Sequence, residues 1–178
     1  MRAERTHTRN TGQKEKSMPN PRQRRVAFGC DHRGAALREA VFKELERHGM
    51  LEIAVSYGAT TTLEEVDYTA PALEVCELIR GGNADVGILI CGSGVGMDMT
   101  ANRAGTRAAL CRSEHDARLA RAHNNADVLC LGADVTAPRL AAAIIGVFLS
   151  TPFDNDPGHA RRIVILDEMD VIERLAGT

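Results

Sequence analysis

The sequence predicts an α/β fold, a three-layer αβα sandwich in which helices cover both faces of a five-stranded, parallel, Rossmann-like sheet. After Arg24, short apolar runs alternate with segments of helical spacing about five times, which is the pattern of repeated β-α units. Residues 85–90 form an apolar run of the kind that a strand buried on both faces requires. The 178 residues suit one domain, which we place at 24–178 and expect to end in a C-terminal helix.

The first two β-α units follow from spacing and from the residues that end helices. Residues 25–29 are a short apolar run, and residues 34–48 have helical spacing before Gly49, with one face formed by Leu37, Val41 and Leu45. Residues 53–55 are the second expected strand. The second expected helix begins at Pro71, which suits a first helical turn, and runs to about residue 80.

The remaining units repeat this alternation toward the C-terminus. After the strand at 85–90, further strands are expected at 106–111 and 126–131. The remaining helices, which share helical spacing of apolar residues, are expected at 96–104, 114–123, 137–149 and 160–175.

Composition argues against several classes of function. Aromatic residues make up 3% of the chain, Trp is absent and the net charge is −2, which disfavours nucleic acid and anionic membranes as partners. No apolar run reaches transmembrane length. The five cysteines include no CxxC pair, so we expect no disulfide framework, no metal and a reducing, cytoplasmic location. Residues 1–23 are polar, basic and aperiodic, and we expect a disordered tail there.

The predicted topology gathers several reactive side chains. Right-handed crossovers bring the carboxyl ends of parallel strands to one edge of the sheet, where ligands bind in such folds. Cys30-Asp31-His32, the segment 91–96 and Cys111 follow strands and belong to this edge. We expect His123 to meet them there.

The segment Gly92-Ser93-Gly94-Val95-Gly96 joins a buried strand to a helix. Glycines let the backbone approach a ligand with its N–H groups, and the helix N-terminus favours an anion. The segment is not a dinucleotide fingerprint, because Met97 and Met99 stand where a last glycine belongs. It is neither a Walker loop nor a nucleophile elbow. A tight turn without a ligand is the alternative.

Cys91 comes directly before these backbone donors. A thiol at a helix N-terminus has a lowered pKa, and the thiolate acts as a nucleophile or as a base. The alternative is a small buried apolar residue, which is the interpretation we keep for the other four cysteines.

Polar residues elsewhere have both functional and structural readings. Asp31-His32 suits hydroxyl or phosphate binding and proton transfer, or else a helix cap with a surface histidine. His123 and Asn124 follow a helix, where histidine also complements the helix dipole and Asn forms turns. His159 and the arginines after it place positive charge at a helix start, which hints at an anionic ligand or an acidic partner.

Together these segments resemble the type B ribose-5-phosphate isomerases and the related galactose-6-phosphate isomerase subunits. The resemblance covers about residues 25–170 and is most specific at the central segment 87–96. The other matching segments are Val26 to His32, Asp67-Tyr68, Ala101-Asn102-Arg103 and His123-Asn124.

The resemblance implies an aldose–ketose isomerase that uses no metal or organic cofactor. Cys91 would be the base that moves a proton through a cis-enediolate intermediate, and His123 the acid that assists ring opening. Ser93 and the turn amides would stabilise the enediolate oxygens. The residues of that turn are Gly92, Gly94, Val95 and Gly96.

The resemblance also implies how the sugar phosphate is held. Asp31 and Asn124 would bind hydroxyl groups, Tyr68 would line the pocket, and His32 and Arg162 would reach the phosphate. The family is dimeric or larger, so we expect a homodimer or homotetramer whose sites are shared between subunits.

Two departures from the family bear on the substrate. Asp134 and Gly158 stand where arginines are common, and a carboxylate that faces a phosphate would weaken its binding. Ribose 5-phosphate is the expected substrate, and a tetrose or hexose phosphate remains open. The alternatives to an isomerase are a non-catalytic sugar-phosphate or nucleotide-binding module and a thiol-dependent acyl transferase or hydrolase.

Overall fold

The structure is a computed structural model that describes residues 24–49 and 53–176. The predicted tail at 1–23 lies outside the described residues. Strands form one parallel sheet in the order β2-β1-β3-β5-β4, which confirms the predicted fold class. The strands are β1 (Val26–Cys30), β2 (Ile53–Gly58), β3 (Val86–Cys91), β4 (Ala108–Leu110) and β5 (Val128–Gly132). The helices are α1 (Arg38–Arg47), α2 (Thr69–Arg80), α3 (Val95–Arg103), α4 (Glu114–Ala122), α5 (Pro138–Ser150) and α6 (Pro157–Ala176).

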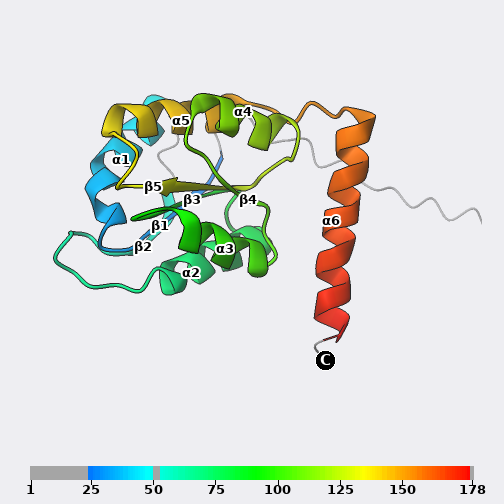
Figure 1. The fold of residues 1–178 in the computed structure, drawn as a ribbon, viewed down its shortest axis with the longest axis horizontal. Helices are drawn as coiled ribbons and strands as arrows, with labels where there is room; N and C mark the ends of the chain where they lie inside the picture. The colour runs from blue at the N-terminus through cyan, green and yellow to red at the C-terminus, as the bar shows by residue number, and fades with distance from the viewer. Residues whose placement is uncertain (1–23, 50–52, 177–178) are drawn as a thin grey trace, which may run out of the picture.

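Helices cover both faces of the sheet, as Figure 1 shows. Helices α1, α4 and α5 pack on one face, and α2 and α3 on the other. Successive strand side chains alternate between the two cores, so that Phe28 and Ile88 belong to the first while Ala27 and Leu89 belong to the second. Strands buried on both faces explain why their sequences are apolar without alternation.

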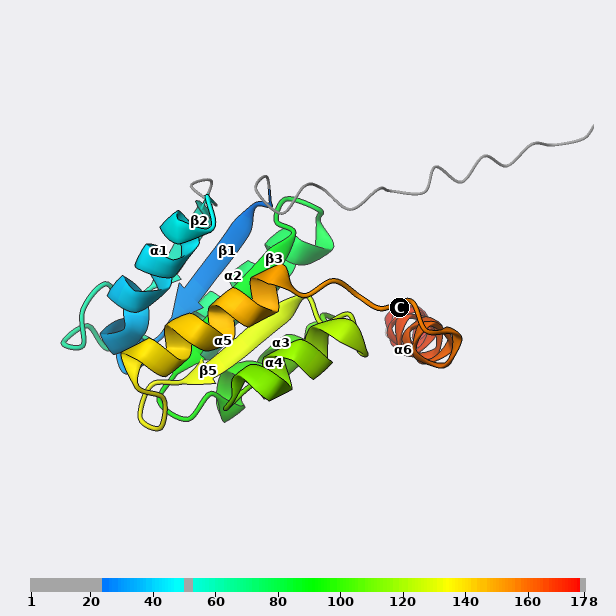
Figure 2. The ribbon, with the colours of Figure 1, turned by 90° about the horizontal axis from the view of Figure 1, so that it is seen from above.

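Helix α6 stands outside the sandwich, beyond the β4 edge (Figure 1 and Figure 2). Arg107 ties it to the sheet through an ion pair of 2.7 Å with Asp167. A cavity of about 720 Å³ lies between α6 and this edge, with Leu110 and Leu166 among its lining residues. Among the helices that the structure describes, none has the length and apolar character needed to cross a membrane.

Most predicted boundaries differ from the structure by a few residues, and two of the differences have local reasons. The strand expected at 106–111 is shorter, because Thr106 Oγ1 donates to the Ala101 carbonyl at 2.8 Å and Arg107 N donates to the Asp127 carboxylate at 2.9 Å. The helix expected at 34–48 opens with a 3-10 turn over Gly34–Leu37.

The fully buried Ile144 tests the core between α5 and the sheet. We expect Ile144→Ala to lower the free energy of unfolding by about 2–5 kcal/mol, because the substitution leaves a cavity in a packed interior. Leu63→Ala is the control, since that side chain is 92% exposed. Urea denaturation measures both, and equal stabilities of the two variants would contradict this view of the core.

Candidate active site

Cys91 is the last residue of β3 and is 5% exposed. Its Sγ accepts a hydrogen bond of 3.1 Å from the backbone N–H of Gly94. This contact exists because Gly94 has a φ of +79°, which turns the chain sharply between β3 and α3 and favours glycine. An N–H directed at the sulfur stabilises negative charge on it, as a base or nucleophile requires.

The glycine-rich turn is packed against the end of β5. A Cβ at Gly132 would lie 2.6 Å from the Ser93 carbonyl oxygen, and one at Gly94 would lie 2.5 Å from Leu110 Cδ1. Ser93 itself is exposed, and its Oγ accepts a hydrogen bond of 3.3 Å from Val95 N. The backbone of the turn is therefore fixed by its packing on β5, while the Ser93 side chain is exposed to solvent.

Asp31 and Tyr68 reach the same edge of the sheet as Cys91. Asp31 is 6% exposed, its N donates to the Ile90 carbonyl at 3.2 Å, and its Oδ1 accepts from Gly34 N at 2.7 Å. Tyr68 lies against the start of α3, because a Cβ at Gly96 would be 2.8 Å from the Tyr68 ring.

His32 follows Asp31 at this edge and is half-buried. Its Nδ1 lies 3.4 Å from the carbonyl oxygen of Val66, in the segment that leads to Tyr68. Asp31, His32 and the turn therefore lie at the edge that the predicted topology gave them, and Tyr68 joins them there.

An ion pair between Arg33 and Asp134 also occupies this edge, and sequence reasoning did not find it. Both side chains approach Gly92, where a Cβ would lie 2.6 Å from Arg33 Nε and 2.8 Å from Asp134 Oδ2. The backbone N–H of Asp134 donates to the Gly92 carbonyl at 2.9 Å. The carboxylate that we expected to oppose a phosphate therefore has its own counter-ion beside it.

His123 does not meet Cys91 within the chain, which corrects the expectation from sequence. Gly132, the last residue of β5, pairs with Cys91, so the carboxyl ends of β3 and β5 coincide. His123 and Asn124 instead precede β5 and lie at the amino edge. The physical reason is that each helix of a parallel sheet returns the chain to the amino end of the next strand.

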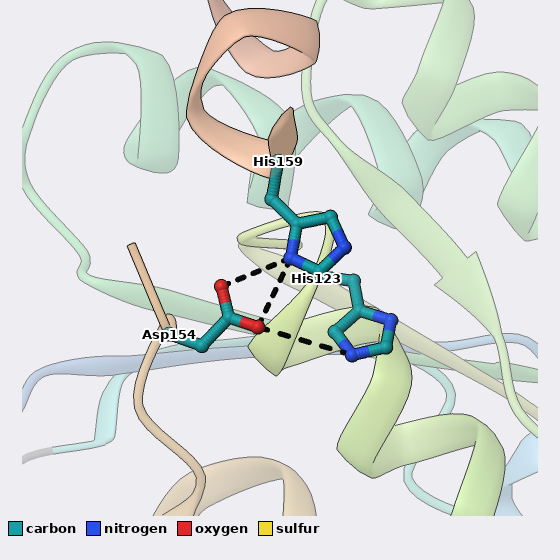
Figure 3. A group of neighbouring side chains, drawn as sticks. All are labelled: His123, Asp154 and His159. Carbon is teal, nitrogen blue, oxygen red and sulfur yellow. Dashed lines mark hydrogen bonds and ion pairs between the residues drawn. The ribbon is translucent and has the colours of Figure 1, made fainter. Parts of the chain in front are cut away.

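At the amino edge His123 belongs to a second cluster of polar side chains, drawn in Figure 3. Asp154 lies beside two imidazoles, with its Oδ2 3.9 Å from His123 Nε2 and 3.0 Å from His159 Nδ1. The two imidazole rings stack with centroids 4.2 Å apart. The hydrogen bond from His159, followed by that from Asp156 N, lowers the pKa of the Asp154 carboxyl. Arg162 follows His159 on α6 and is exposed.

The chain thus carries two polar clusters on opposite edges of its sheet. One contains a hydrogen-bonded thiol, a turn of amides and a buried carboxylate, which suits proton transfer next to an anionic oxygen. The other contains imidazoles around a carboxylate, which suits acid catalysis, anion binding or a metal.

Comparison with known proteins places these features in a family. A family model described as Ribose/Galactose Isomerase matches residues 26–166. Ribose-5-phosphate isomerase B of Escherichia coli is 36% identical over 79% of this chain and 92% of its own length. D-erythrulose-4-phosphate isomerase of Pectobacterium atrosepticum is 37% identical over 73% of this chain and 85% of its own length. The structure of Trypanosoma brucei type B ribose 5-phosphate isomerase superposes with a TM-score of 0.77 at 40% identity, over 83% of this chain and 99% of that one.

The environments of the five cysteines predict selective chemistry at Cys91. Burial raises the pKa of Cys30 to about 11 and that of Cys111 to about 12, and it also raises the pKa values of Cys76 and Cys130. These thiols stay protonated and unreactive at about pH 8. We expect iodoacetamide to modify Cys91 first, which peptide mass spectrometry would locate. Modification of any of the other four ahead of Cys91 would contradict the assignment.

Proposed function

Because the chain belongs to the Ribose/Galactose Isomerase family and is a sugar-phosphate isomerase, we propose that it interconverts ribose 5-phosphate and ribulose 5-phosphate with Cys91 as the base. The observation that carries the proposal is the hydrogen bond of 3.1 Å from Gly94 N to Cys91 Sγ, beside Asp31 at the carboxyl edge. A thiol with an amide donor at its sulfur is equipped to carry negative charge between proton transfers.

The reaction requires one proton to move between neighbouring carbons of the open-chain sugar. The Cys91 thiolate takes the proton from the carbon next to the carbonyl, and the electron pair forms a cis-enediolate. Cys91 returns the proton to the former carbonyl carbon, while the hydroxyl proton passes between the two oxygens. Ser93 Oγ and the turn amides are suited to hold the charge on those oxygens. Asp31 is suited to bind a sugar hydroxyl, and Tyr68 to close the pocket over α3.

The substrate also needs an acid for ring opening, and His123 fills that role only if it arrives from a second copy of the chain. This follows from its place at the amino edge, opposite Cys91. We therefore assign the protein as a homodimer or larger homo-oligomer in which His123, Asn124 and Arg162 of one copy complete the Cys91 half-site of another.

Helix α6 supports this assembly. Four of the apolar side chains that the structure describes on this helix are exposed in the single chain by 43–55% of their surface, namely Val164, Ile165, Leu166 and Met169. Exposed apolar side chains on a helix that projects from the domain are the type of surface that a permanent oligomer buries.

The phosphate end of the pocket involves Arg33 as well as His32. Arg33 Nε and Cζ lie at the mouth of the turn, next to Gly92, and a guanidinium paired to one carboxylate keeps further N–H donors. The pair removes the penalty that Asp134 alone would impose on a phosphate.

A tetrose phosphate is the second candidate substrate. The relative named for D-erythrulose 4-phosphate is about as similar to this chain as the one named for ribose 5-phosphate, at 37% and 36% identity. Nothing in the proton-transfer half-site distinguishes the two sugars, because the reaction involves only the carbonyl carbon and its neighbour.

Turnover of four-, five- and six-carbon aldose phosphates, followed by ketose formation, tests the function. We expect ribose 5-phosphate to give the highest kcat/KM, and Cys91→Ala to lower kcat by roughly 10²–10⁴-fold, the usual contribution of a positioned acid or base. Cys111→Ala, which removes a buried thiol, should keep wild-type kcat and serves as the control. Unchanged kcat in Cys91→Ala would exclude Cys91 as the base.

Mixing two inactive variants tests the shared site. In a heterodimer of Cys91→Ala and His123→Ala chains, one site combines the intact Cys91 of one chain with the intact His123 of the other. Random reassociation should therefore restore about a quarter of wild-type activity in a twofold dimer. A mixture of Cys91→Ala with Cys91→Ser chains is the matched control. Failure of the first mixture to regain more activity than the control would show that each site lies within one chain.

A further inference from the structure

The cluster of His123, Asp154 and His159 has a geometry that a metal ion can use. One donor atom from each residue lies within 4.8 Å of the other two, and His159 Nδ1 is 3.0 Å from both oxygens of Asp154. Tetrahedral zinc with bonds of about 2.0–2.1 Å holds its ligand atoms roughly 3.3 Å apart. Side-chain rotations that move the donor atoms by about 1 Å would bring all three donors to one ion.

The backbone around these side chains is already fixed. Asp154 N donates to the Ala122 carbonyl at 3.0 Å, which anchors the loop before α6 to the end of α4, where His123 lies. Within that loop, Asp154 Oδ1 accepts from Asp156 N at 3.0 Å, and Asp156 Oδ1 accepts from Gly158 N at 2.8 Å. The three donors come from two helix ends and one tied loop, so little ordering is required for an ion to bind.

The donor set selects among metals. Two imidazoles and one carboxylate suit Zn²⁺, Co²⁺, Ni²⁺ or Cu²⁺, whereas Mg²⁺ and Ca²⁺ prefer oxygen ligands alone. The side chains are exposed by 41% for His123, 36% for Asp154 and 21% for His159, so an ion reaches them from solvent and keeps positions for water.

We propose that His123, Asp154 and His159 form an inhibitory site for Zn²⁺ or a divalent ion of similar chemistry. The ion accepts lone pairs from a His123 ring nitrogen, from His159 Nδ1 and from the Asp154 carboxylate, and the Nδ1 proton of a neutral His159 moves to Nε2 when the ion binds. The inhibitory part rests on the proposed role of His123 as an acid, because a metal-bound nitrogen cannot donate a proton. The binding part does not depend on that role.

Two readouts on the full-length protein, freed of metal with EDTA, test the site. Visible absorption during Co²⁺ titration reports coordination by nitrogen and oxygen, and calorimetry with Zn²⁺ gives the affinity. We expect one ion per chain in the wild type, and roughly a tenfold or greater loss of affinity in His159→Ala and in Asp154→Asn. His115→Ala, on an exposed histidine of the same α4, is the matched control and should bind like the wild type.

The Cys91→Ala chain separates this site from the thiol and from catalysis. It should bind Co²⁺ as the wild type does, although it is inactive. In the active enzyme Zn²⁺ should lower the initial rate, EDTA should restore it, and the residual activity of Asp154→Asn should resist Zn²⁺. Loss of Co²⁺ binding in Cys91→Ala, or equal binding in wild type and both cluster variants with native melting temperatures, would overturn the site. Binding without inhibition would leave the metal site standing and overturn the acid role of His123.

Discussion

The parallel sheet imposes one constraint on which the rest of the molecule depends. In the part of the chain that the structure describes, the loops that follow strands lie at one edge of the sheet, and the loops that lead from helices into strands lie at the other. Cys91 follows β3, and His123 precedes β5, so the base and the acid of the proposed mechanism are separated by the length of the strands. Under that mechanism oligomerisation is part of the chemistry, because a second chain is needed to place an amino-edge imidazole at a carboxyl-edge thiol.

The fold follows from the sequence to a large extent, because apolar runs such as 86–90 and the residues that end helices report local structure directly. The carboxyl-edge residues Asp31 and Cys91 follow for the same reason. The order of the strands does not follow from the sequence, because no local signal indicates that β5 lies between β3 and β4. The expectation that His123 lies beside Cys91 is wrong for a single chain because a match to a family motif does not report nearness in space, whereas the position of His123 before a strand indicates the amino edge.

The Arg33–Asp134 pair shows a different limit of prediction from sequence. The two residues are 101 positions apart, and neither is unusual in its own segment. Only the register that aligns the ends of β1, β3 and β5 brings them together. Their side chains are 57% and 41% exposed, and exposed ion pairs contribute about 0–1 kcal/mol to stability. The pair is therefore better understood through its field at the pocket mouth than through any effect on folding.

That field bears on which anion the pocket accepts. An unpaired Asp134 beside Gly92 would repel a phosphate and also any enediolate at the neighbouring turn, whereas the pair presents a guanidinium edge with little net charge. The ion pair also orients the guanidinium, whose remaining N–H groups can donate to two phosphate oxygens at once. If Arg33 contacts the phosphate as proposed, its place at the mouth of the turn makes that contact depend on the distance between the carbonyl carbon and the phosphate, which is the dimension in which four-, five- and six-carbon sugars differ.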